Sequence, residues 1–165
     1  MRYSFCPKCG GRLVEKIVDG LSRPVCVDCD FVFYQNPPVQ SVVVAVKQGK
    51  VLAITWGDGK KFALPAGFVE ENEEAMQGAK RELYEETGLS CKKLSLLEVS
   101  NRLVSSEGMK LPAVSVYFKA EDVEGELNPR ENHLKAMWLD LNDLPLESVF
   151  YPDDRNVIRK LKELK

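Results

Sequence analysis

The stretch GFVEENEEAMQGAKRELYEETGL, residues 67–89, predicts the fold of this chain more strongly than any other. It predicts one amphipathic helix over about residues 74–87, entered from a glycine-containing loop. Asn72 is the candidate N-cap, because its side-chain oxygen can accept a hydrogen bond from an unpaired backbone N–H. Gly88 suits the left-handed conformation that ends many helices.

One face of this helix begins apolar and ends in carboxylates. At about 100° per residue, four residues share a narrow stripe and a fifth flanks it: Ala75, Ala79, Glu82 and Glu86, with Glu85 beside them. The negative charges repel each other and lie where the helix dipole disfavours them, so the cluster calls for a cation. Oxygen ligands favour Mg²⁺ or Mn²⁺. The alternative is a solvated acidic face, which is common in Glu-rich helices.

The stretch also matches the pattern G-x5-E-x7-R-E-U-x-E-E-x-G-U, where U is aliphatic. The matching residues are Gly67, Glu73, Arg81, Glu82, Leu83, Glu85, Glu86, Gly88 and Leu89. The pattern resembles the signature of the Nudix hydrolases at every defined position. The resemblance implies an α/β fold, the Nudix α/β/α sandwich with a mixed sheet. It also implies a metal-dependent pyrophosphohydrolase that cleaves a nucleoside diphosphate linked to another group.

Carried over by position, the resemblance implies roles for single residues. The metal ligands for Mg²⁺ or Mn²⁺ would be Glu82, Glu85, Glu86 and the backbone carbonyl of Ala66. Arg81 would belong to the catalytic site and also form a structural ion pair with Glu73. Gly67 and Gly88 would be structural residues of the same box.

A glutamate beyond the box is the candidate base. In Nudix enzymes a loop glutamate in this region often completes the site as base or metal ligand, and Glu131 matches by position. Glu126 and Glu98 are the rivals. His133 is the only histidine in the sequence, and no role is assigned to it, since a lone loop histidine is more often a surface residue.

Residues 1–36 predict a zinc ribbon. Cys6 and Cys9, then Cys26 and Cys29, form C-x2-C, sixteen residues and C-x2-C, a spacing typical of a four-thiolate zinc site. So short a segment buries little core, so the structural Zn²⁺ would supply its folding energy. Disulfides and a redox dithiol are the alternatives. Cys91 is interpreted as a small core or surface residue.

Residues 37–165 form the predicted Nudix domain. Strands are expected at about 39–46, 51–55, 93–102, 113–119 and 137–140, and in the ribbon at about 12–17 and 24–27. A last helix would start from a cap at Asp153 or Asp154 and run through Leu161. The aromatic residues Phe31, Phe33 and Tyr34 would cover the junction between ribbon and domain rather than stack on a substrate base.

Composition limits the partners. The 165 residues carry a net charge of −2, and the ribbon segment is nearly neutral, so nucleic acid and anionic membranes are unexpected partners for the chain as a whole. No apolar run approaches the roughly 20 residues that span a bilayer. The start of the chain lacks the apolar stretch of a secretory signal, so a cytoplasmic location is expected.

A zinc ribbon followed by a Nudix domain resembles one branch of the family, which holds NADH pyrophosphatases and a shorter group that hydrolyses FAD or ADP-ribose. The NADH enzymes carry S-Q-P-W-P-F-P-x-S beyond the box, and residues 90–120 contain nothing like it. A small-molecule substrate of the ADP-ribose or FAD type, cleaved to two monophosphates, is therefore expected, and the resemblance suggests a homodimer. A nucleotide sensor without catalysis, or a hydrolase of capped RNA or NADH, stays open.

Overall fold

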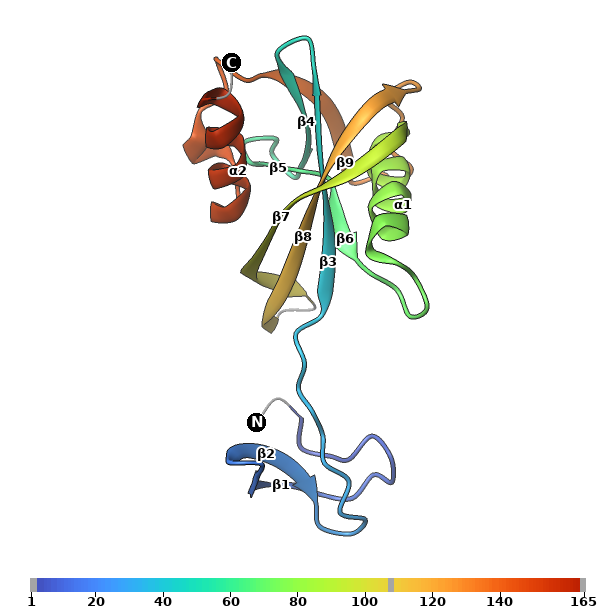
Figure 1. Cartoon of the computed structure of the whole chain (residues 1–165), viewed down its shortest axis with the longest axis vertical. Helices are drawn as coiled ribbons and strands as arrows, with labels where there is room; N and C mark the ends of the chain where they lie inside the picture. The colour runs from blue at the N-terminus through green and yellow to red at the C-terminus, as the bar shows by residue number, and fades with distance from the viewer. Residues whose placement is uncertain (1–2, 107–108, 164–165) are drawn as a thin grey trace. The chain divides into compact units, whose positions relative to one another are not determined.

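The computed structural model describes residues 3–106 and 109–163, and the chain forms two compact units, Met1–Pro37 and Pro38–Lys165 (Figure 1). No helix in the described residues is long and apolar enough to cross a membrane.

The first unit is built on an antiparallel hairpin of β1 (Leu13–Val18) and β2 (Leu21–Cys26). Asp19 and Gly20 form the turn, with φ of 52° and 75°. Two consecutive left-handed residues are typical of the type I′ hairpin turn, for which Asp-Gly is a preferred sequence. The strands predicted at about 12–17 and 24–27 left too long a turn between them, because that prediction did not take the Asp-Gly turn signal into account.

Aromatic residues pack on the small core of this unit. Phe31 and Phe33 lie against the cluster formed by Cys6, Leu13 and Cys26. Phe33 also meets Tyr3 edge-to-face, with ring centroids 5.4 Å apart. These two phenylalanines therefore belong to the hydrophobic core of the ribbon itself.

The second unit contains a mixed sheet with strand order β5-β4-β3-β8-β7, to which β6 and β9 are added beside β3 and β4. Only β3 and β8 pair in parallel among these strands as described. The bounds are β3 Val39–Lys47, β4 Lys50–Trp56, β5 Phe62–Ala63, β6 Ala66–Phe68, β7 Ser90–Ser106, β8 Met109–Glu124 and β9 Leu134–Asp140.

A helix covers each face of this sheet (Figure 1), so the predicted α/β/α sandwich is confirmed. Side chains alternate along β3, as strand geometry requires. Val43 packs with Ala79 and Leu83 of α1 (Ala75–Thr87), whereas Val42 packs with Val157 of α2 (Pro152–Glu163). A short 3-10 helix, Leu146–Ser148, precedes α2.

The two helices begin differently from the predictions. Glu74 caps α1 through a capping box with Gln77, whereas Asn72 lies earlier in the loop with a φ of 68°. Helix α2 begins at Pro152, since proline suits the first helical position. Asp154 therefore lies inside the helix and is not its cap.

Asp154 instead joins three segments in the interior. Its carboxylate is fully buried, and Oδ1 accepts hydrogen bonds from Arg102 of β7 and Tyr117 of β8, each at 2.8 Å. Oδ2 accepts one from the backbone N–H of Leu64, at 3.2 Å. These hydrogen bonds satisfy the buried carboxylate, which helps the interior to tolerate the ion pair.

We expect Asp154→Ala to lower the free energy of unfolding by about 3–5 kcal/mol, because it removes the nearest carboxylate from the buried Arg102 cation and leaves only Asp153, at 3.6 Å. Urea denaturation measures this change. Tyr117→Phe is the matched control, since it keeps the ion pair and removes only the two hydrogen bonds of the hydroxyl, one to Asp154 and one from Arg102. It should cost about 2 kcal/mol. Equal, small effects of both variants would contradict the importance of the buried pair.

Candidate active site

Arg81 links the loop before α1 to the helix. Its Nε and Nη2 donate to the two carboxylate oxygens of Glu73, each at 2.9 Å, and Nη2 also donates to the carbonyl of Phe68 at 2.9 Å. This two-pronged ion pair holds the pKa of Glu73 below its usual value. The loop and the helix are thus joined as the box pattern implied.

The same guanidinium faces two further carboxylates of the helix. Nη1 donates to Glu82 and, at 3.1 Å, to Glu85. Glu82 is only 8% exposed, and its burial raises its pKa although Arg81 opposes the effect. The single guanidinium of Arg81 therefore pairs with three carboxylates, and its one positive charge cannot neutralise all three.

Gly67 makes room for Glu82. A Cβ built on Gly67 would lie 1.9 Å from Oε1 of Glu82, far inside contact distance. Any larger residue at position 67 would displace this carboxylate. The glycine that opens the box is therefore required by the close approach of the helix carboxylate to the strand backbone.

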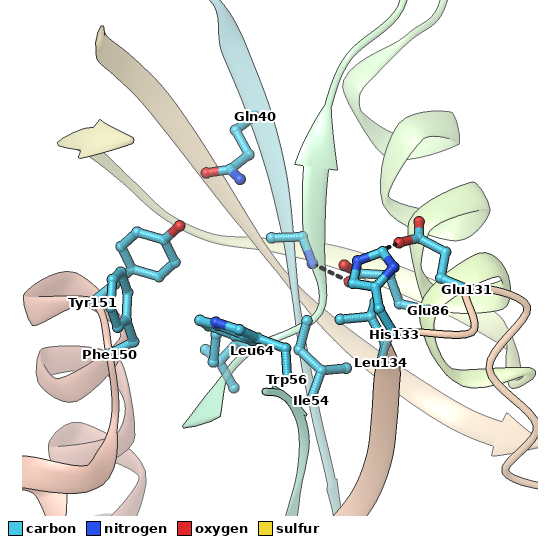
Figure 2. A pocket seen from close by; sticks show the side chains of 12 residues that line it. Gln40, Ile54, Trp56, Leu64, Glu86, Glu131, His133, Leu134, Phe150 and Tyr151 are labelled. Atoms are coloured by element: carbon cyan, nitrogen blue, oxygen red, sulfur yellow. Dashed lines mark hydrogen bonds and ion pairs between the residues drawn. The ribbon is translucent and has the colours of Figure 1, made fainter. Parts of the chain in front are cut away.

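Glu86 lies one turn further along α1 and faces a cavity. Its side chain accepts a hydrogen bond from the backbone N–H of Ala66 at 2.7 Å (Figure 2). The residue is 7% exposed, and burial raises its pKa to about 9, with the charges of Glu82 and Glu131 adding to the effect. Glu86 thus binds the backbone N–H of Ala66, the residue whose carbonyl is expected to be a metal ligand.

The cavity has a volume of about 480 Å³ and two chemically different ends. Glu86 and Glu131 lie at one end, and Trp56, Phe150 and Tyr151 lie at the other (Figure 2). The aromatic rings contact each other edge-to-face, with centroids 5.5 Å apart for Trp56 and Phe150 and 4.9 Å apart for Phe150 and Tyr151. Such a site can hold a polar anionic group and a flat ring together.

The structure separates the candidates for the base. Glu131 lines the cavity with Glu86, whereas Glu98 forms an ion pair with Lys160 and is not among the lining residues. Glu126 does not line the cavity either. His133, to which the sequence interpretation gave no role, does line it, and its Nε2 lies 3.3 Å from Oε2 of Glu131.

The aromatic wall was also missed by sequence reasoning. Trp56 ends β4, and Phe150 and Tyr151 immediately precede α2. Aromatic residues at the ends of elements, beside loops, were the available signal. Because Trp56 and the Phe150–Tyr151 pair are about ninety residues apart, no local sequence pattern indicates that they are in contact.

The acidic residues fit a divalent cation in charge and in donor chemistry, although their carboxylates are not gathered into a tight cluster. Among the described residues, only the four cysteines place three or more possible ligand atoms within 4.8 Å of one another. Glu82 and Glu86 are nonetheless buried, and burial together with the charge of nearby carboxylates raises the pKa of each. Oxygen donors with uncompensated charge suit Mg²⁺ or Mn²⁺.

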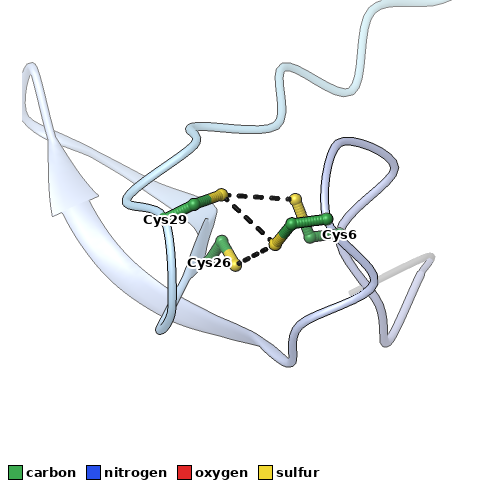
Figure 3. A group of neighbouring side chains, drawn as sticks. Cys6, Cys26 and Cys29 are labelled. Atoms are coloured by element: carbon green, nitrogen blue, oxygen red, sulfur yellow. Dashed lines mark hydrogen bonds between the residues drawn. The ribbon is translucent and has the colours of Figure 1, made fainter.

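The four cysteines of the first unit converge (Figure 3). The Sγ atom of Cys9 lies 3.4 Å from that of Cys29 and 3.5 Å from that of Cys26, and Cys6 and Cys29 are 3.8 Å apart. Bonds of about 2.3 Å to one tetrahedral zinc would place sulfurs about 3.8 Å apart. The backbone N–H groups of Lys8 and Gly11 donate to Cys6 and Cys9 at 3.4 Å, which stabilises thiolates.

Comparison with known proteins identifies the family. The NUDIX domain model matches residues 35–161. The chain belongs to the Nudix hydrolase family. A second model, the zinc-ribbon Nudix N-terminal segment, matches residues 4–35. The predicted family and its zinc-ribbon subtype are thereby confirmed.

Individual relatives differ in their named substrates. The chain is 31% identical to the NAD-capped RNA hydrolase NudC of Haemophilus influenzae (strain PittGG), over 96% of this chain and 58% of that protein. It is 34% identical to the ADP-ribose pyrophosphatase of Methanocaldococcus jannaschii, over 68% of this chain and 67% of that protein. The chain therefore spans little more than half the length of its NudC relatives.

A solved structure agrees over nearly the whole chain. A NUDIX hydrolase from Nitrosomonas europaea superposes with a TM-score of 0.73 at 26% identity, covering 98% of this chain and 92% of that one. The NUDIX domain of Shewanella oneidensis NrtR, solved with ADP ribose, superposes with a TM-score of 0.63 at 20% identity, which shows the shared fold.

We expect the Nudix unit without magnesium to be stabilised by Glu86→Gln, increasingly so as pH rises. The folded protein holds the Glu86 pKa near 9, so between about pH 4.5 and 9 it keeps a proton that the unfolded chain releases. Stability therefore falls as pH rises through this window. Glutamine removes that dependence and can still accept the Ala66 N–H.

Melting temperatures in magnesium-free buffer at pH 5.5, 7 and 8.5 measure the effect. Glu71→Gln, at an exposed loop position, is the control and should follow the wild type at each pH. A difference between Glu86→Gln and wild type that shrinks as pH rises would show that the Glu86 carboxylate is not desolvated in solution.

The cysteine geometry predicts about one zinc per chain, bound independently of magnesium. Elemental analysis of protein purified without chelator measures it. Cys26→Ser should lose the metal, whereas Cys91→Ser, outside the cluster, should retain it. Disulfides among the four cysteines, found by mass spectrometry in place of zinc, would contradict the assignment.

Proposed function

We propose that this chain is a metal-dependent pyrophosphohydrolase for nucleoside diphosphates linked to another moiety, of the ADP-ribose or FAD type. The observation that carries the proposal is one cavity whose carboxylate end and aromatic end face each other (Figure 2). Cleavage of the diphosphate would yield two monophosphates, AMP and either ribose phosphate or FMN.

At the carboxylate end, Glu82, Glu85, Glu86 and the backbone of Ala66 would hold Mg²⁺ or Mn²⁺. When bound, such ions neutralise charge on the diphosphate and make water a better nucleophile. Arg81 keeps Glu82 and Glu85 in place through its hydrogen bonds to both. Glu131, at the same end of the cavity as Glu86, would accept the proton from the attacking water.

At the aromatic end, the nucleobase would rest against Trp56 and Tyr151. Aromatic side chains bind bases by stacking, which is worth about 1–3 kcal/mol per base. The guanidinium of Arg102 lies 4.5 Å from the ring centroid of Tyr151 and supports that ring from the interior. The cavity of about 480 Å³ lies within the usual range for small-molecule sites.

The relatives support a dinucleotide or nucleotide-sugar substrate. One is named an ADP-ribose pyrophosphatase, and the NudC proteins are named for NAD-capped RNA. A capped RNA end is the second candidate, because the similarity to NudC covers 96% of this chain. The near-neutral ribbon and the missing NADH motif favour free ADP-ribose or FAD over RNA and NADH.

Zinc would be structural, holding the first unit folded apart from the catalytic ions. A sensor without catalysis is disfavoured by the intact carboxylates at the cavity. A homodimer and a cytoplasmic location stay predictions, the first from family resemblance and the second from composition.

A side-by-side measurement of kcat/KM for ADP-ribose, FAD, NADH, a dinucleotide-capped RNA and a set of triphosphates at fixed Mg²⁺ tests the substrate class. ADP-ribose and FAD should lead, with monophosphates as products. Glu86→Gln should lower activity on all of them by about 100-fold or more, because metal ions supply several kcal/mol of charge stabilisation.

Trp56→Leu separates the two ends of the site. It should raise KM for ADP-ribose about tenfold through lost stacking, and leave kcat nearly unchanged because the carboxylate end is untouched. A preference for triphosphates with release of pyrophosphate, or for NADH over both leading substrates, would refute the proposed substrate class.

A further inference from the structure

The loop that carries Glu131 and His133 connects β8 to β9 and passes the C-terminal end of α1. Its backbone is bonded to that helix end. The N–H of Asn128 donates to the carbonyl of Thr87 at 2.9 Å, and the N–H of Arg130 donates to the carbonyl of Glu85 at 2.8 Å. Carbonyls of a last helical turn lack partners within the helix, so the loop satisfies them.

Gly88 permits this close passage. Its φ is 79°, and a Cβ there would lie 2.8 Å from the backbone N and O of Asn128 and from the carbonyl oxygen of Glu126. The glycine that closes the box therefore serves the loop as well as the helix end.

A side-chain contact completes the attachment. The guanidinium of Arg130 lies 4.2 Å from the ring centroid of Tyr84, and its Nη2 donates to the Tyr84 hydroxyl. Tyr84 is 42% exposed, so the contact lies at the surface and outside the cavity. Tyr84 occupies the undefined position x of the box pattern, so the pattern itself does not demand this pair.

The contact has a direct consequence for the cavity. Glu131 follows Arg130 in the chain and faces the same space as Glu86 (Figure 2). A loop attached only by backbone bonds at the helix end could still swing about them. Stacking of a cation on an aromatic ring adds about 0.5–1 kcal/mol at an exposed site and restricts that movement.

We propose that Tyr84 and Arg130 are positioning residues that hold the Glu131 carboxylate over the end of α1 for catalysis. Neither residue lines the cavity, and each acts through the loop. The inference rests on the proposed hydrolase function and on the role of Glu131 within it.

The test is a double-mutant cycle on kcat. Arg130→Ala should lower kcat for ADP-ribose about 10- to 100-fold, as loss of an outer partner of a catalytic group typically does, with KM within about twofold. Glu131→Gln should lower kcat at least as much. In the Glu131→Gln background, Arg130→Ala should have no further effect, because the group it positions is already gone.

Matched variants separate positioning from general damage. Tyr84→Phe keeps the ring and should keep kcat within about threefold, whereas Tyr84→Leu should resemble Arg130→Ala. Arg159→Ala, at an exposed arginine of α2, should leave kcat unchanged. The melting temperatures of these variants should stay close to that of the wild type, because Tyr84 and Arg130 are both exposed.

Full activity of Arg130→Ala and Tyr84→Leu beside an impaired Glu131→Gln would refute the positioning role of Tyr84 and Arg130 and leave the role of Glu131 intact. Additive losses in the double mutant would also refute that positioning role, since Arg130 would then act independently of Glu131. Full activity of Glu131→Gln would refute both the role of Glu131 and the positioning role of Tyr84 and Arg130. Hydrolysis by the wild type would still support the proposed function in that case. No hydrolysis of any substrate by the wild type would refute the function itself.

Discussion

The close approach of α1 to the backbone of residues 66–68 is the constraint on which this site depends. Glu82 lies over Gly67, Glu86 accepts the N–H of Ala66, and Arg81 donates to the carbonyl of Phe68. Three successive backbone positions are thus held by three side chains of one helix. Burying carboxylates in this way is unfavourable unless they are paired or bind a cation. The acidic face of α1 therefore carries a cost in stability that a bound cation would offset.

The same segment is also held from the other helix. Asp154 of α2 accepts the N–H of Leu64, two residues before Ala66, and it is anchored in turn by Arg102 and Tyr117. Arg102 then stacks beneath Tyr151 at the aromatic end of the cavity. Buried hydrogen bonds and ion pairs of this kind specify one arrangement of the elements they join. Strand, cavity wall and both helices are therefore coupled through a few charged side chains.

The sequence predicted what is encoded in contiguous stretches. The box helix, its acidic face, the cysteine quartet and the mixed sheet all follow from local spacing or periodicity. Contacts between distant residues were not predictable in this way. Asp154 sits near a helix start, so it resembles a cap, and its partner Arg102 is 52 residues away. Likewise, a lone histidine in a loop carries no local signal, and only the attachment of its loop to α1 brings His133 to the cavity.

This division has a functional meaning. The carboxylate end of the cavity is formed by Glu86 of α1, Ala66 of β6 and Glu131 of the loop before β9, whereas the aromatic end comes from Trp56 and the Phe150–Tyr151 segment. That segment is held by a hydrogen bond from the N–H of Phe150 to the carbonyl of Phe62, at 2.7 Å. Residues at element ends can change without disturbing the buried carboxylates. The family signature and the aromatic end of the cavity therefore lie in different parts of the chain, and a complete box identifies the family without identifying the substrate.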